Sequence, residues 1–285
     1  MGSPRGFPAG GPGGACGRAG DVPGFQHGRG PGGGGTAGGR GPGGGGPAGL
    51  RGDGVPRRRG RRGSAGRTGG RGGAAVRGGR ARLAVLVSGR GTNLQAILDA
   101  TRAPDYPAEV VVVVSDRPGA YALERARQAG VPAHVVPWSR DPADFGRRLA
   151  EVLDAHQAQW VCLAGFLRIL PPEFVQRYRG RILNIHPSLL PAFGGRGMYG
   201  ERVHQAVLAS GAVESGCTVH FVTEDVDAGP VVAQARVPVL PDDTVETLAA
   251  RVAEQEHRLY PEAIRRVVTG QVRFDDLAAA EQLAR

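Results

Sequence analysis

"LAVLVSGRGTNLQAILDATR", residues 83–102, sets the fold because it contains a strand, a turn and a helix in order. Residues 83–88 form an apolar run that Gly89 ends. A run without polar alternation is typical of a strand that is buried on both faces, as in parallel sheets. Residues 92–102 follow with the apolar spacing of a helix. The stretch therefore predicts one βα unit of a parallel sheet.

The same alternation continues toward the C-terminus. Further buried strands are expected at 109–115, 133–137, 160–165 and 181–186, and helices at 120–130, 141–156 and 171–178. The helix at 141–156 has the clearest start signal, with Asp141 as N-cap and Pro142 at its first position. Such a βαβ series predicts a Rossmann-like α/β fold, in which helices cover both faces of a mostly parallel sheet.

The pattern changes after residue 187. A glycine-rich loop leads to a helix near 200–210, and a long helix is expected at 244–268. Between them, residues 217–222 and 230–239 have the pattern of two strands joined by a short acidic turn. We therefore expect an antiparallel C-terminal part of the sheet.

Residues 1–80 differ in composition from the rest of the chain. They hold 34 of the 49 glycines and 14 arginines against two aspartates, whereas residues 81–285 hold 22 arginines against 24 acidic residues. A segment with so few large apolar side chains cannot offset its ordering entropy, so we expect residues 1–80 to be disordered and residues 81–285 to form the domain. Three origins of the segment stay open: a start assigned too far upstream of a native start near residue 80, a transit peptide, or an RNA-binding tail.

Cysteine usage and hydropathy argue against several classes of protein. Cys16, Cys162 and Cys217 lack paired spacing, which indicates a reducing, cytoplasmic location. No apolar run reaches the length of a membrane span, so we expect no membrane association. Cys217 and His220 would face opposite sides of a strand and have no second pair, so we expect no metal site.

The turn "SGRGTNL" (88–94) is a candidate anion site. Backbone N–H groups of such a turn, with the N-terminus of the following helix, bind anions. Leu94 stands where a dinucleotide fingerprint needs its third glycine, and the Walker lysine is absent. Thr92 and Asn93 add two hydrogen-bonding side chains, which favours phosphate binding; the alternative is a tight turn that only needs glycine.

The strand "RILNIH" (181–186) has two polar side chains at its end. Asn184 and His186 are two residues apart, so both face the same side of the strand, which Pro187 ends. Ligands of open α/β sheets bind at the carboxyl edge, where an amide can donate to an oxyanion and an imidazolium can transfer a proton. The alternative is two hydrogen-bonded core residues.

Two carboxylates complete the candidate site. Asp227 lies in the turn "TEDVDAGP" (223–230), just before the chain re-enters a strand, so it can fold back and stabilise the imidazolium form of His186. Glu256 lies within the apolar stripe of the last helix, where a carboxylate is costly without a partner. That partner is either a structural salt bridge or a hydroxyl or amine of a ligand.

Six segments together make the chain similar to the phosphoribosylglycinamide formyltransferase family, the folate-dependent transformylases of purine synthesis. They are "LVSGRGTNLQAI" (86–97), "LERARQAGV" (123–131), "LAGFLRIL" (163–170), "LNIHPSLLP" (183–191), "GCTVHFVTEDVDAGPVVAQ" (216–234) and "EHRLYP" (256–261). Alone, "NIHPSLLP" marks the wider formyltransferase fold; with "SGRGTNLQAI" the set is highly specific. The resemblance covers residues 82 to about 274.

The resemblance implies roles for named residues. Asn184, His186 and Asp227 would be catalytic. Gly91, Thr92 and Asn93 would bind the phosphate of glycinamide ribonucleotide, and Glu256 its ribose or glycinamide part. Folate would contact Arg140, Leu167, Arg168, Ile169, Leu170, Asn184, Thr223, Glu224, Asp225, Val226 and Asp227. The loop at 192–204 departs from the family pattern, and Arg202 and His204 are candidates to complete the phosphate site.

The implied reaction moves the formyl group of the co-substrate 10-formyltetrahydrofolate to the glycinamide amine of 5-phosphoribosylglycinamide, in de novo purine (IMP) biosynthesis. Asn184 and His186 would stabilise the oxyanion of the tetrahedral intermediate, and Asp227 would keep His186 charged and help to move the amine proton. The implied enzyme acts on small molecules in the cytoplasm without metal, membrane or nucleic acid, as a monomer or homodimer.

Three other functions stay open. A methionyl-tRNA formyltransferase should have a further C-terminal domain and a basic tRNA surface, whereas residues 81–285 are slightly acidic. A formyltetrahydrofolate deformylase should have an N-terminal regulatory domain, which the Gly/Arg-rich segment does not resemble. An RNA-binding protein could use residues 1–80 to bind RNA and the α/β domain as a scaffold.

Overall fold

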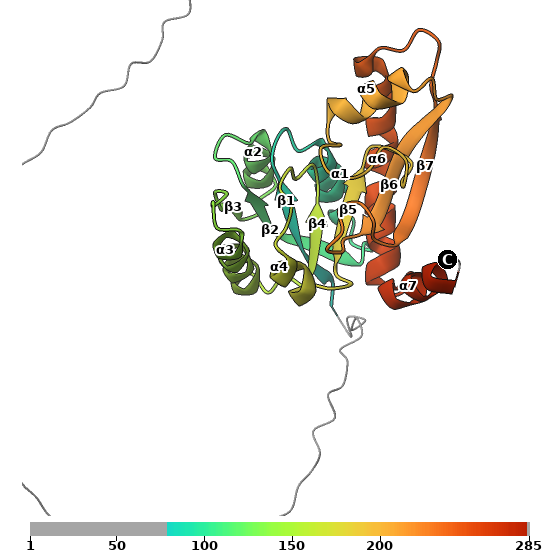
Figure 1. Ribbon diagram of the computed structural model, residues 1–285. Coiled ribbons are helices and arrows are strands. Elements are labelled where there is room, and N and C mark those ends of the chain that lie inside the picture. The colour runs from blue at the N-terminus through green and yellow to red at the C-terminus, as the bar shows by residue number, and fades with distance from the viewer. Residues whose placement is uncertain (1–78, 284–285) are drawn as a thin grey trace, which may run out of the picture. The chain divides into compact units, whose positions relative to one another are not determined.

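The computed structural model describes residues 79–283, so the predicted disorder of residues 1–80 lies almost wholly outside the described residues. Seven strands form a single sheet (Figure 1). The strands are β1 (Ala81–Val87), β2 (Ala108–Ser115), β3 (Ala133–Val135), β4 (Trp160–Leu163), β5 (Ile182–His186), β6 (Glu214–Phe221) and β7 (Val231–Pro238). The helices are α1 (Thr92–Thr101), α2 (Tyr121–Gln128), α3 (Pro142–Ala155), α4 (Pro172–Arg177), α5 (Glu201–Ala209), α6 (Val245–Val268) and α7 (Phe274–Leu283).

The sheet is parallel from β3 to β5 and antiparallel from β5 to β7. Its strand order is β3-β2-β1-β4-β5-β6-β7, so the chain starts at the centre, runs out to one edge and returns to the other side of β1. The antiparallel pairing of β5 with β6 and of β6 with β7 confirms the expected change after residue 187. The register places Asn184 opposite His220 and His186 opposite Thr218.

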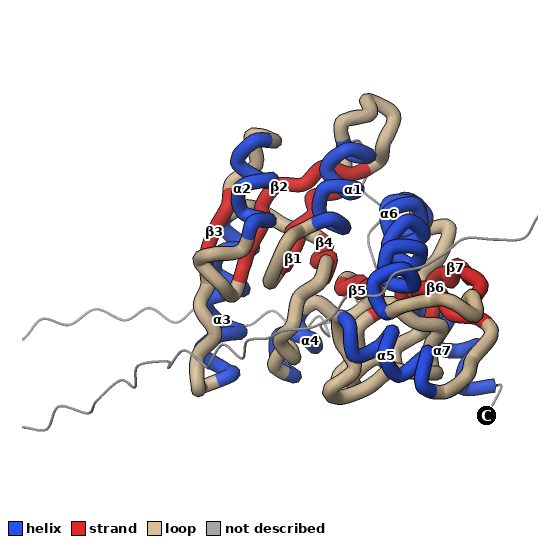
Figure 2. The backbone as a smooth tube through the Cα atoms, turned by 90° about the horizontal axis from the view of Figure 1, so that it is seen from above, coloured by secondary structure: helices blue, strands red, loops and turns tan. Residues whose placement is uncertain are grey.

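Helices cover both faces of the sheet, as predicted. Alternate residues of β1 enter different cores: Leu83 and Val85 join one apolar cluster, and Ala84 and Leu86 join the other. Residues of α1, α2 and α6 complete the first cluster, and residues of α3 and α4 the second. Figure 2 shows α1 and α6 on one side of the strands and α3 and α4 on the other. Burial of each large apolar side chain contributes about 1.5–3 kcal/mol, which explains why this strand has no polar alternation.

A buried tyrosine ties α6 to the centre of the sheet. The hydroxyl of Tyr260 donates to the carbonyl oxygens of Leu163 and Leu183, at 3.1 and 3.0 Å. Leu163 ends β4 and Leu183 lies in β5, so this one side chain connects α6 to two neighbouring strands. The long helix is thereby held next to the strand that carries the polar pair.

Several details differ from the sequence-based expectation. The strand expected at 217–222 begins three residues earlier, at Glu214, and the strand expected at 133–137 ends at Val135. The strand expected at 160–165 ends at Leu163, because Gly165 adopts a left-handed φ of 69° and turns the chain. The helix α7 is not predicted by the apolar pattern. Its first residue, Phe274, packs edge-on against the ring of Phe221, with the two ring centres 5.4 Å apart. Within residues 79–283, no helix is long and apolar enough to cross a membrane.

Candidate active site

A cleft of about 880 Å³ opens where β1, β4 and β5 end. Two groups of polar residues line it. The β5 group consists of Asn184, His186, His220 and Asp227, and the α1 group consists of Thr92, Asn93 and Glu256. The sequence therefore brings residues from both halves of the domain to the carboxyl edge of the sheet, as expected for an open α/β sheet.

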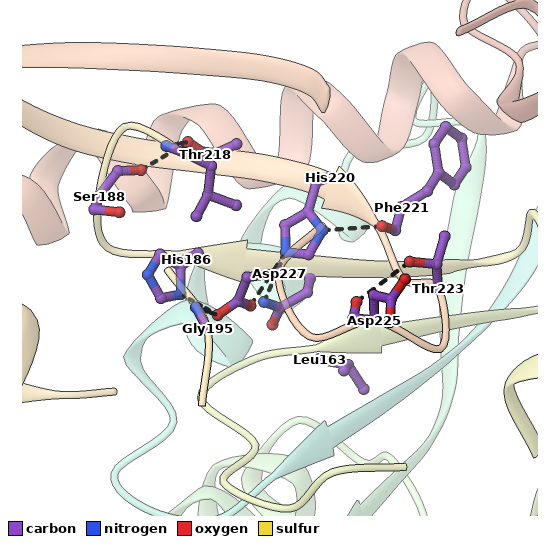
Figure 3. Close-up of polar contacts among 12 residues, drawn as sticks. Leu163, His186, Ser188, Gly195, Thr218, His220, Phe221, Thr223, Asp225 and Asp227 are labelled. Atoms are coloured by element: carbon purple, nitrogen blue, oxygen red, sulfur yellow. Dashed lines mark hydrogen bonds and ion pairs between the residues drawn. The ribbon is translucent and has the colours of Figure 1, made fainter. Parts of the chain in front are cut away.

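Asp227 lies between two histidines (Figure 3). Its Oδ2 atom is 3.6 Å from His186 Nδ1, and its Oδ1 atom is 3.7 Å from His220 Nε2. All three side chains are nearly buried, so the carboxylate acts in a medium that screens charge poorly. The structure thus places Asp227 next to His186, where the turn at 223–230 was expected to place it.

His220 determines how Asn184 is oriented. His220 Nδ1 donates to the carbonyl oxygen of Phe221 at 2.9 Å, which leaves Nε2 of the neutral ring as an acceptor. Asn184 Nδ2 donates to this atom at 3.1 Å. Burial lowers the pKa of His220, so the neutral ring is the favoured form. The remaining N–H of the Asn184 amide has no hydrogen bond to another described residue, and it is available to a ligand in the cleft.

The loop after β5 is held by Thr218. Its Oγ1 atom donates to the carbonyl oxygen of Ser188 at 2.7 Å and accepts from the backbone N–H of Leu190 at 3.0 Å. Gln234 Nε2 donates to the same oxygen at 2.9 Å. Two side chains of the adjacent antiparallel strands therefore fix the segment that follows Pro187.

This loop in turn holds the catalytic candidates. His186 Nε2 is 2.9 Å from the carbonyl oxygen of Phe193, and the N–H of Gly195 donates to Asp227 Oδ2 at 2.9 Å. Both nitrogens of the His186 ring thus face acceptors, an arrangement that suits an imidazolium, which donates from both nitrogens. Asp227 itself has a left-handed φ of 57°, which directs its side chain back into the cleft.

The α1 group is built on a tight turn. Gly91 has a φ of 74°, and a Cβ atom there would lie 2.6 Å from the Cβ of Ala122. The helix that follows has no side-chain N-cap, so its first N–H groups are left for an anion. The glycine is therefore required by the turn, and the same turn presents the N-terminus of α1 to the cleft.

Among the residues that the structure describes, Glu256 has an amide as its partner and forms no salt bridge, although a salt bridge is one of the two expectations. Asn93 Nδ2 donates to Glu256 Oε2 at 2.9 Å. Burial raises the pKa of Glu256, and the bond from Asn93 opposes this rise. Asn93 Oδ1 is buried without a hydrogen-bond partner among the described residues. One unsatisfied acceptor therefore lies beside the carboxylate.

The other residues named from the sequence divide into two sets. The first set lines the cleft. It consists of two folate-binding candidate segments and two phosphate-site candidates: Leu167, Arg168, Ile169, Leu170, Thr223, Glu224, Asp225, Val226, Arg202 and His204. Arg140 is exposed and, like Gly91, is not among the cleft-lining residues. His204 is buried with Nδ1 unpartnered, and its burial, together with nearby His186, lowers its pKa.

The sequence-based site lacks several residues that line the cleft, among them three basic ones: His220, Arg90 and Arg196. The sequence analysis treats His220 only as a possible metal ligand, although a histidine on the buried pattern "CTVHFV" signals a polar group that needs partners. Arg90 and Arg196 also line the cleft and, like Arg202, form no ion pair with another described residue. Across residues 79–283, no group of three or more His, Cys, Asp or Glu side chains is arranged to hold a metal ion.

Comparison with known proteins agrees with this geometry. A family model described as formyl transferase matches residues 81–264. A phosphoribosylglycinamide formyltransferase of Haemophilus influenzae is 42% identical over 197 residues, which cover 68% of this chain and 91% of that protein. The crystal structure of glycinamide ribonucleotide transformylase 1 from Symbiobacterium toebii superimposes with a TM-score of 0.64 at 48% identity, covering 70% of this chain and 93% of that one.

Some relatives are much longer than this chain. The trifunctional purine biosynthetic protein adenosine-3 of Bos taurus is 46% identical over 199 residues, which cover 69% of this chain but only 19% of that protein. The chain thus spans about a fifth of this relative and nearly all of the Haemophilus one.

Proposed function

The chain belongs to the formyl transferase family, and we propose that it transfers the formyl group of 10-formyltetrahydrofolate to the glycinamide amine of 5-phosphoribosylglycinamide. The products are formylglycinamide ribonucleotide and tetrahydrofolate, in de novo purine biosynthesis. The observation that carries this proposal is the placement of Asp227 beside His186 and close to Asn184, in one cleft with the N-terminus of α1. Catalytic groups and an anion site thus share one cavity.

Asn184 and His186 would stabilise the oxyanion that forms when the amine attacks the formyl carbon. Asn184 has one amide N–H already oriented by His220 and a second one free for the formyl oxygen. His186 Nε2 contacts the carbonyl oxygen of Phe193, so the formyl oxygen would replace that carbonyl as acceptor. Removal of one such oxyanion donor typically costs ~3–4 kcal/mol of transition-state stabilisation.

Asp227 would balance the charge of His186 and help to move the proton. The attacking amine loses a proton and the leaving folate nitrogen gains one, so a base and an acid are needed close together. Gly195 holds one carboxylate oxygen of Asp227 in place, and that oxygen faces His186 Nδ1, which can carry a proton. Acid–base assistance of this kind contributes roughly 10²–10⁴-fold in rate.

The rest of the cleft supports the assignment of the two substrates. The N–H groups at the start of α1, with Thr92 and with Arg90 and Arg202, which form no ion pair within residues 79–283, suit a phosphate. Leu167 and Ile169 are 41% and 47% exposed at the cleft, as befits an apolar surface for the aromatic part of folate. The proposal also includes small-molecule partners only, action in the cytoplasm, no step that uses a metal, and a monomer or homodimer.

One assay tests this function. We expect purified protein to consume 10-formyltetrahydrofolate only when glycinamide ribonucleotide is present, and to produce formylglycinamide ribonucleotide in equal amount. Two parallel reactions test the rivals, one with methionyl-tRNA as acceptor and one with water alone. Formylation of the tRNA, or hydrolysis as fast as transfer, would contradict the proposal.

A further inference from the structure

A fully buried carboxylate lies outside the proposed catalytic group. Asp116 follows the end of β2, and none of its side chain is exposed. Its Oδ2 atom accepts from Arg168 Nε at 2.7 Å, while its Oδ1 atom is buried without a partner among the described residues. A buried carboxylate is costly unless it is paired, so this ion pair is a strong structural constraint.

The constraint acts on an arginine at the wall of the cleft. The Arg168 guanidinium lies over the ring of Trp138, with its carbon 5.4 Å from the ring centre, and its side chain is 36% exposed. Arg117 Nε is 3.8 Å from the same Asp116 oxygen. The planar guanidinium is thus held on two sides, by the carboxylate at its Nε and by the indole at its face.

Arg168 is the middle residue of the apolar surface proposed to bind folate. Leu167 and Ile169 flank it along the chain, and both are exposed in the cleft. The backbone N–H of Leu167 donates to Ser88 Oγ at 2.9 Å, and the N–H of Ser88 donates to the carbonyl oxygen of Gly165 at 3.2 Å. Ser88 therefore anchors the start of the segment to β1, and Asp116 anchors its middle to β2.

We propose that Asp116 is a positioning residue for the formyl donor: through Arg168 it holds the Leu167–Ile169 surface in the arrangement that binds the donor. This inference rests on the proposed function, because the donor is the ligand of that surface. A binding surface works only if its supporting residues hold it in the correct geometry, so a Leu167–Ile169 surface that has lost this support should bind the donor more weakly. Asp116 is not among the cleft-lining residues, and its shorter ion pair is the one with Arg168, so we expect its effect on the donor to pass through Arg168.

Steady-state kinetics give the first test. We expect Asp116→Ala to raise KM for 10-formyltetrahydrofolate about tenfold while KM for glycinamide ribonucleotide and kcat stay within about twofold. Asp116→Asn keeps an oxygen that accepts from Arg168, so its rise in KM should be smaller. In an Arg168→Ala background, Asp116→Ala should add nothing further. Equal increases in both KM values, or additive effects of the two changes, would overturn the inference.

A matched control uses another ion pair of the same length. Arg236 and Glu214 are also 2.7 Å apart, but both are more than half exposed at the far strands β6 and β7. Glu214→Ala should leave both KM values unchanged, since exposed pairs contribute little to stability. If Glu214→Ala raised KM for the donor as much as Asp116→Ala does, the effect would be general loosening and the inference would be wrong.

Calorimetric titration with tetrahydrofolate separates the two proposals. A wild-type protein that binds tetrahydrofolate but transfers no formyl group would contradict the proposed function alone, and Asp116→Ala should still bind tetrahydrofolate about tenfold more weakly. If Asp116→Ala binds tetrahydrofolate as tightly as the wild-type protein, the positioning role of Asp116 is excluded whatever the reaction is. A wild-type protein that does not bind tetrahydrofolate contradicts both.

Discussion

The β5 group and the α1 group line one cleft but satisfy their polar atoms in different ways. In the β5 group, the carbonyl oxygens of Phe193 and Phe221 and the N–H of Gly195 pair with His186, His220 and Asp227. In the α1 group, Asn93 Oδ1 is buried, and within the described part of the chain it has no hydrogen-bond partner and the N-terminus of α1 has no side-chain cap. The side chains of the first group are oriented before substrate arrives, with only the Phe193 carbonyl to be exchanged at His186, whereas the second keeps hydrogen-bonding capacity for a ligand.

This difference follows from what each group is proposed to do. Stabilisation of a transition state requires donors that are already oriented, because the free energy needed to reorient them during the reaction would offset the stabilisation that they provide. Binding can tolerate a buried atom without a partner, at about 1–3 kcal/mol, if the ligand then supplies that partner. Changes in the β5 group should therefore affect kcat, and changes in the α1 group should affect KM.

The largest effect is expected at Asp227. Asp227→Asn keeps the size and backbone tolerance of the side chain but removes its charge, so kcat should fall about 10³-fold or more while the fold is retained. Turnover and the circular dichroism spectrum are the measurements, with Asp242→Asn as an exposed aspartate control. A variant of Asp227 with near-normal turnover would end the claim that this carboxylate is catalytic.

The next effect tests whether His220 acts through Asn184. Asn184→Ala should lower kcat by about 10²–10³-fold through loss of an oxyanion donor. His220→Phe removes the acceptor that orients the amide and should lower kcat about tenfold. The double variant should be no worse than Asn184→Ala alone. If the two effects multiply, His220 has a separate role and the β5 group is not a single unit.

Glu256 gives a smaller effect of a different kind. Glu256→Gln should raise KM for glycinamide ribonucleotide about tenfold with kcat little changed, because a charged acceptor is lost.

The same substitution should stabilise the folded protein at high pH, although it weakens substrate binding. Burial raises the pKa of Glu256, so the stability that this group contributes is present below the ordinary pKa of glutamate and lost as pH rises through the raised value.

Urea unfolding at two pH values measures this second response. The Gln variant should be more stable than the wild-type protein at pH 8, and its advantage should shrink as pH falls toward 5. A Gln variant that is less stable at pH 8 would show that the carboxylate is well compensated, and the contrast between the two groups would weaken.

The smallest effect concerns the pH dependence of stability at His220. Burial lowers the pKa of His220, so its contribution is present above the ordinary pKa of histidine and lost as pH falls through the lowered value. Between pH 7.5 and 5, the free energy of unfolding should therefore fall less in His220→Gln than in the wild-type protein. His204 and His257, whose pKa values burial also lowers, should keep part of the slope. An unchanged slope would mean that His220 does not titrate in this range.

Much of the fold could be predicted because its strands are buried on both faces. The apolar runs at β1 and β2 have no alternation, and each ends at a polar residue, Ser88 or Ser115, that lies within one residue of the end of the observed strand. The helix α3 begins at Pro142 with Asp141 as its N-cap, as predicted, because capping depends only on neighbouring residues. Features that depend only on neighbouring residues, such as strand ends and helix caps, can therefore be predicted from the sequence.

The contacts that complete the site depend on register and could not be predicted. Asn184 meets His220 only because β5 and β6 pair antiparallel with that one alignment, which no local pattern specifies. Asn93 and Glu256 are 163 residues apart in the chain, and their bond requires α1 and α6 to pack together. The type of each group was visible in the sequence, but its partner was not.

The left-handed backbone at Asp227 has a consequence for which residues this position can accept. Asparagine and aspartate enter that conformation several-fold more readily than other side chains that have a Cβ, and a β-branched residue there is strained. The backbone thus favours a short set of residues at this position, namely glycine, asparagine, aspartate and histidine, although Gln157 and Phe193 also have a positive φ. Of that set, only aspartate carries a negative charge, so the backbone conformation and the proposed reaction favour the same residue.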